Sequence, residues 1–124
     1  MVEKLTPNQV RRIEEVQQFI RTVEHVKKLV AELEGNRAAK ATVLNGISSQ
    51  IQRELSQMRQ RAMTSNVGTV ADVAGSLAVI AGRVGTGLNL KIRALNDGVT
   101  SLMMQLDQAL KAAHEPDKTD KKPS

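Results

Sequence analysis

The sequence predicts an all-α fold, an elongated helical bundle of three to four antiparallel helices that associates into an oligomer. Apolar residues recur in steps of three and four along most of the 124-residue chain, which is the period of an amphipathic helix. Aromatic residues make up 1 % of the chain, and Phe19 is the single one, so the core must come from aliphatic and small side chains. Such a core leaves one copy marginally stable, and we expect further copies to supply part of the buried area.

The first predicted helix covers residues 7–34. Thr6 suits the N-cap position and Pro7 suits the first helical position, and Gly35 is expected to cap the end. The apolar face is formed by Val10, Ile13, Val16, Ile20, Val23, Val26, Val30 and Leu33. The helix would be roughly 42 Å long at about 1.5 Å per residue, which favours an elongated bundle.

A second helix is predicted over residues 37–63 and a third over residues 69–83, with turn-forming residues between them. The third helix has few polar positions and many small side chains, so it should be covered on most sides. We expect it to lie at the bundle centre or at the seam between copies, where a charged substitution at Ala78 or Gly82 would break the assembly. The residues predicted for self-association are Val70, Val73, Ala74, Leu77, Ala78, Ile80, Ala81 and Gly82.

A fourth helix is predicted over residues 88–113, after a break at Gly85-Thr86-Gly87 that is either a turn or a kink. Asn96-Asp97-Gly98 is also typical of a hairpin turn, and the apolar residues just before it alternate, so a short β-hairpin is the competing interpretation. The steps of three and four continue to Leu110, which favours the helix.

Residues 1–112 are predicted to form one helical bundle domain, and residues 113–124 a disordered polar tail that lacks large apolar side chains. The chain has no cysteine, which excludes disulfides and thiolate chemistry. It has no run of about 18 apolar residues, so we expect no integral membrane span. With no apolar signal segment at the start, a cytoplasmic location is expected.

The residue pattern offers no catalytic arrangement. Nucleophile, base and orienting groups do not occur together, and the glycine-rich segment 82–87 lacks the Lys-Ser or Lys-Thr ending of a phosphate loop. The Glu-x-x-His pairs of metal-binding bundles are missing. We therefore expect no enzymatic activity, no cofactor and no metal. The main prediction is a non-enzymatic scaffold or adaptor that acts through helix–helix contacts, most simply as a homo-oligomer.

The charge distribution suggests an alternative. The formal net charge of +5 comes entirely from the segment between Gly35 and Leu106, which contains eight basic and three acidic residues. Such a localised charge attracts phosphates or an acidic protein partner. A nucleic-acid interface would use the residues Arg53, Arg59, Arg61, Lys91 and Arg93. The lack of aromatic residues argues against stacking on single strands, so contact with a duplex backbone is the form this alternative takes.

His25 is the basis of a second alternative. It lies mid-way along the first predicted helix, and Lys28 follows three residues later. An exposed helical histidine beside a cation is what a histidine phosphotransfer or signalling module needs, because the imidazole is the nucleophile and the lysine balances phosphoryl charge. The His-x-x-Lys spacing is a loose pattern, and Leu29 and Val30 follow where small residues are usual.

Overall fold

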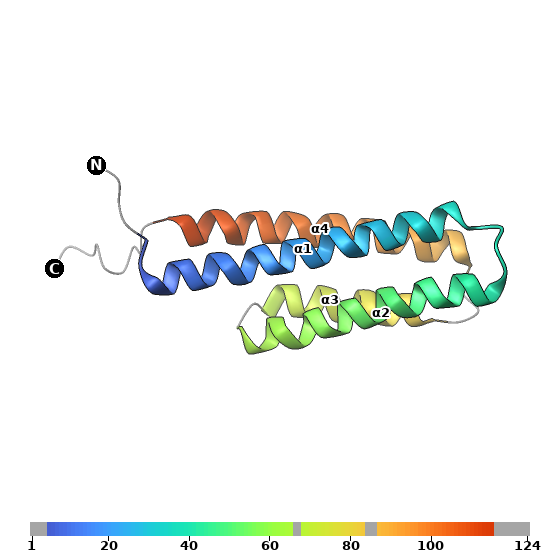
Figure 1. Cartoon of the computed structure of the whole chain (residues 1–124), viewed down its shortest axis with the longest axis horizontal. Helices are drawn as coiled ribbons and strands as arrows, with labels where there is room; N and C mark the ends of the chain where they lie inside the picture. The colour runs from blue at the N-terminus through green and yellow to red at the C-terminus, as the bar shows by residue number, and fades with distance from the viewer. Residues whose placement is uncertain (1–4, 66–67, 84–86, 116–124) are drawn as a thin grey trace.

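The computed structural model describes residues 5–65, 68–83 and 87–115, and within these ranges the fold is all-α, as predicted. Its helices are α1 (Pro7–Gly35), α2 (Ala41–Thr64), α3 (Gly68–Gly82) and α4 (Leu88–His114). They lie side by side in an elongated bundle, and consecutive helices run in opposite directions (Figure 1). Each helix contacts its two neighbours, so that α1 lies diagonally opposite α3, and α2 diagonally opposite α4.

Helix α1 begins at the predicted position because a capping box fixes it. The Thr6 hydroxyl accepts a hydrogen bond from the backbone N–H of Gln9 at 3.1 Å, and the Gln9 side chain accepts one from the N–H of Thr6 at 2.9 Å. These bonds satisfy two of the amides that a helix start leaves without partners. The helix ends with Gly35, and Asn36 is the C-cap, with its backbone N–H directed to the carbonyls of Glu32 and Leu33.

The second helix begins later than predicted. Residues 36–39 form turns and a bend, and Lys40 is the N-cap of α2 with an extended backbone and no side-chain capping bond. The sequence of residues 37–40 is compatible with a helix. In the structure these residues belong to the connection that lets α2 run back along α1.

The region between α3 and α4 is a break between two helices and not a kink in one. Helix α3 ends at Gly82 and α4 begins at Leu88, while residues 84–86 lie outside the described ranges. The competing β-hairpin interpretation is wrong, because α4 passes without interruption through Asn96-Asp97-Gly98. The helical period of the apolar residues on both sides outweighs the local turn preference of this tripeptide.

The predicted tail starts too early. Helix α4 continues to His114, and Ala113 is buried in its last turn. Gln9 stabilises this end, since its side-chain amide donates to the carbonyl of Glu115 at 2.7 Å and approaches that of Ala113 at 3.5 Å. The predicted disorder concerns residues 116–124, which lie outside the described part of the chain.

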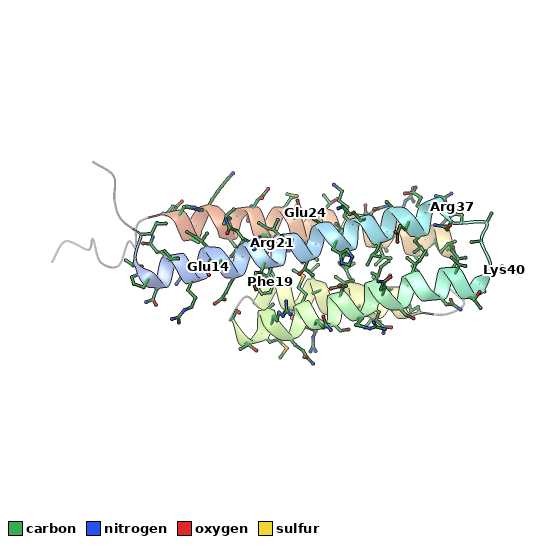
Figure 2. All side chains as sticks on the ribbon, viewed as in Figure 1. Glu14, Phe19, Arg21, Glu24, Arg37 and Lys40 are labelled. Atoms are coloured by element: carbon green, nitrogen blue, oxygen red, sulfur yellow. The ribbon has the colours of Figure 1, made fainter. Side chains whose placement is uncertain are left out.

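One continuous core runs the length of the bundle and draws on all four helices. The largest fully buried side chains are Leu33, Ile51, Leu55, Met58, Leu95, Leu102 and Leu106. Phe19 points from α1 toward the α2–α3 hairpin and is 3 % exposed (Figure 2). Each such residue stabilises the fold by about 1.5–3 kcal/mol relative to an exposed position. A single copy therefore encloses much more of its apolar surface than the scarcity of aromatic residues led us to expect.

Candidate functional site

The structure assigns most of the predicted self-association residues to the core of one copy. Five of the eight are buried, namely Val70, Ala74, Leu77, Ala78 and Ala81. Val73 and Ile80 are partly buried against the core, and Gly82 is exposed beside the Gln52 side chain of α2. The prediction that α3 would be covered on most sides agrees with this burial, but neighbouring helices of the same chain provide the cover. A charge at Ala78 would therefore disturb the bundle itself.

Val73 and Ile80 belong instead to an outer surface shared by α3 and α4. Leu77 of α3 contacts Gly98 of α4, which identifies the sides on which these helices meet. Residues in steps of three and four from this contact line the solvent edge of the seam. We call this the α3–α4 surface; it consists of Val73, Ser76 and Ile80 from α3, and Leu90, Ala94, Asp97, Ser101, Met104, Gln105 and Gln108 from α4.

The α3–α4 surface combines apolar exposure with a low density of charge. Leu90 is 65 % exposed and Met104 is 60 % exposed. Asp97 is the one formally charged residue of this set, Arg83 lies at the edge beyond α3, and Leu90 and Asp97 also line a groove with Glu34, Arg37 and Arg93 at the start of α4. Helix α1 is very different, because charged side chains cover its outer side, among them Glu14, Arg21 and Glu24 (Figure 2).

Gln105 adds an unsatisfied polar group at this surface. Its side-chain amide nitrogen donates to the Ser101 hydroxyl at 3.3 Å, while Oε1 is buried without a hydrogen-bond partner among the described residues. Such an acceptor costs about 1–3 kcal/mol. A rotation of this half-buried side chain toward an added donor would remove the cost.

The predicted basic patch is dispersed. On α2, residues turn by about 100° per position, so Arg59 and Arg61 point to opposite sides. Arg59 lies over Gly75 of α3, with Cδ 2.8 Å from the position of an ideal Cβ, whereas Arg61 lines a cavity between α1 and α2. Arg53 is exposed on the outer side of α2. Arg59 and Arg61 therefore do not share one face of α2.

The other two predicted basic residues do not extend the patch either. Lys91 is 9 % exposed, and burial lowers the pKa of its ammonium group from the ordinary value of 10.5. Arg93 lines a cavity with Glu34 and Arg37 at the opposite end of the bundle from Arg61. Because α2 and α4 lie on a diagonal, α4 does not bring these two basic residues beside those of α2.

His25 has a partner that the sequence analysis missed. Its Nδ1 lies 3.1 Å from Oε1 of Glu54, across the seam between α1 and α2. The side chains are 49 % and 30 % exposed, respectively. Glu54 could have been found in the sequence as a polar residue next to the apolar face of α2, but pairing it with His25 requires the register of the two helices.

The cavities of the bundle are open grooves between helices. One of about 640 Å³ lies over α2 and α3, lined by Arg59, Asp72, Gly75 and Val79 among others. Another of about 440 Å³ lies where α2 ends against α1, and it includes Arg11, Arg12 and Glu15. Neither groove brings together a nucleophile, a base and an oxyanion donor.

The described residues contain no group of three or more His, Asp or Glu side chains that could hold a metal ion. Across the same residues, no helix is both long enough and apolar enough to cross a membrane. The chain matches no protein-family model, and no curated protein and no solved structure shows significant similarity to it.

Proposed function

We propose that the protein is a non-enzymatic helical scaffold whose copies pair through the α3–α4 surface. The observation that carries the proposal is the contrast in charge around the bundle. The α3–α4 surface holds one formal charge, Asp97, and several apolar side chains, whereas charged residues crowd the outer side of α1. Depletion of charge is a compositional mark of the buried part of protein interfaces.

Electrostatics favours a second copy at this surface over the outer side of α1. Two copies with a net charge of +5 each repel one another. The repulsion is smaller where charges are few or of both signs, and the charged residues at and around this surface are Asp97, Arg83, Arg93, Glu34 and Arg37. In a two-fold dimer the same surface is used by both copies, so a neutral, apolar surface is complementary to itself.

Leu90 and Met104 supply the apolar contact, since both are exposed in a single copy. A second copy would also bring amides and hydroxyls to Gln105, whose Oε1 is without a donor in one copy. The proposal thereby keeps α3 at the seam, through Val73 and Ile80, and adds residues of α4 that the sequence did not single out.

Light scattering on the full chain tests the proposal. The native chain should have the mass of a dimer at micromolar concentration. Leu90→Glu and Met104→Glu should weaken the dimer at least tenfold, because burying an unpaired carboxylate costs about 1–3 kcal/mol or more. Both positions are exposed in one copy, so the helical content measured by circular dichroism should not change.

Val79→Glu is the matched control. Val79 is 57 % exposed on the α2-facing side of α3, so the same charge placed there should leave the dimer intact. A native chain that stays monomeric at every concentration would overturn the proposal. If Leu90→Glu and Met104→Glu remain as dimeric as the native chain, the seam lies elsewhere and the α3–α4 surface is not the scaffold contact.

A further inference from the structure

His25 and Glu54 form the single ion-pair geometry between two helices in the described part of the chain. Nδ1 of His25 is 3.1 Å from Oε1 of Glu54, and neither residue belongs to the buried core. The pair lies at the solvent edge of the α1–α2 seam, on the opposite side of the bundle from the α3–α4 surface. Half of the histidine side chain remains accessible to solvent.

The partner of His25 fixes its tautomer. An ionised carboxylate only accepts hydrogen bonds, so the imidazole must donate through Nδ1–H to Glu54. A neutral imidazole has one N–H, and its other nitrogen, Nε2, therefore carries the free lone pair. No described residue forms a hydrogen bond with Nε2. The structure thus presents an oriented and accessible nitrogen nucleophile.

Cations flank this nucleophile on its own helix. Arg21 lies four residues before His25 and Lys28 three residues after it, so both are its neighbours on the surface of α1, and both are exposed. From α2, Glu54 is the acid that faces His25, and it is engaged at Nδ1 and not at Nε2. The long side chains of Arg21 and Lys28 can turn toward a group with two negative charges on this histidine and stabilise it.

We infer that Nε2 of His25 accepts a phosphoryl group from donors that carry it on nitrogen. In the step, the Nε2 lone pair attacks phosphorus, a new N–P bond forms, and the N–P bond of the donor breaks. With zwitterionic phosphoramidate the leaving group is ammonia, which keeps the protons of the donor nitrogen. The phosphorylated ring retains its Nδ1–H and becomes an imidazolium, whose positive charge the Glu54 carboxylate stabilises.

Incubation of the full chain with phosphoramidate tests the inference, and His114 is an internal control. His114 is also exposed, and its Nδ1 lies 2.9 Å from the carbonyl of Leu110, so it has an uncharged acceptor where His25 has a carboxylate. Peptide mass spectrometry should show His25 phosphorylated about tenfold faster than His114, the ratio expected when a charge-assisted hydrogen bond replaces a neutral one. The adduct should be acid-labile and should be the Nε2 isomer by ³¹P NMR.

Two variants sharpen the result. His25→Gln should abolish the fast labelling and leave that of His114 unchanged. Glu54→Gln keeps an acceptor for Nδ1–H but removes the charge. Phosphorylation of His25 should therefore become about tenfold slower and approach the rate at His114. Equal rates at the two histidines, an Nδ1 adduct at His25 or an unaffected rate in Glu54→Gln would each overturn the inference. The dimer proposal is independent of this outcome, because the two sites lie on opposite sides of the bundle.

Discussion

Leu77 of α3 occupies the space that a Cβ atom would take at Gly98 of α4, with the Leu77 Cγ only 2.8 Å from that position. The missing side chain lets the backbone of α4 approach the branched end of Leu77 within van der Waals contact. The glycine in the Asn96-Asp97-Gly98 segment, which in sequence is typical of a turn, thus serves helix packing.

Gly98→Ala should destabilise the bundle. The added methyl group collides with a branched side chain that is 4 % exposed and packed in the core. Such overpacking destabilises the fold by about 1–3 kcal/mol, whereas the higher helix propensity of alanine over glycine stabilises it by about 1 kcal/mol. We expect a net loss of about 1 kcal/mol in the free energy of unfolding, measured by urea titration with circular dichroism.

Two other glycines are controls for Gly98→Ala. A Cβ at Gly46 of α2 would meet nothing within 4 Å, so Gly46→Ala should stabilise the protein by about 1 kcal/mol. At Gly75 a Cβ would meet the flexible side chain of Arg59, which can move away, so Gly75→Ala should be close to neutral. If Gly98→Ala proved as stabilising as Gly46→Ala, the close packing with Leu77 would be refuted.

Gln9 connects the start of α1 to the end of α4. Its Oε1 accepts from the N–H of Thr6 and its Nε2 donates to the carbonyl of Glu115. Gln9→Glu retains the acceptor but loses the donor, and it places a negative charge beside carbonyls at the negative end of α4. We expect a loss of about 1–2 kcal/mol in the free energy of unfolding, and faster amide exchange in the last turn of α4.

Thr6→Ala is the control for Gln9. It removes the α1 cap, at a cost of about 1 kcal/mol, while the amide of Gln9 can still reach α4. Exchange should then increase at the start of α1 and not at residues 112–115. Equal effects of the two variants on both helix ends would contradict the separate roles of the two halves of the Gln9 amide.

Helix positions could be predicted from the sequence because the apolar period and the Thr6–Pro7 start are local signals. The errors arise where tertiary contacts decide. Residues 36–40 have a composition compatible with helix, yet the chain must reverse there for α2 to pack on α1. Ala113 is the predicted boundary between the fourth helix and the tail, and the structure buries it in the last turn of α4, where Gln9 of α1 reaches the backbone carbonyls.

The candidate surfaces were less predictable, because they depend on which helices are neighbours. The small residues of α3 could cover either another helix of the same chain or another copy, and the sequence does not distinguish these. Arg59 and Arg61 of α2 are close in sequence but point to opposite sides of the helix. His25 was recognised for its own chemistry, whereas its partner Glu54 lies 29 residues away and is found only once α1 and α2 are placed in register.

Lys91 allows a prediction on pH. Burial lowers its pKa from 10.5, and its place in the first turn of α4 is unfavourable for a cation. The unfolded chain therefore binds this proton more tightly than the folded one. The destabilisation of the fold by the charged Lys91 is fully present below the lowered pKa of Lys91 in the folded chain. It disappears as the pH rises toward 10.5, so the titration of Lys91 makes the protein more stable at alkaline pH.

Lys91→Met removes the buried charge and keeps a similar shape. At pH 7 we expect it to stabilise the protein by about 1 kcal/mol, the lower end of the desolvation costs of polar groups. The advantage over the native chain should shrink when urea titrations are repeated near pH 10, because the native lysine is then increasingly neutral in the folded state. Lys27→Met on the exposed side of α1 should show neither effect. An advantage of Lys91→Met that stayed constant with pH would mean that apolar packing, and not the ammonium charge, is responsible.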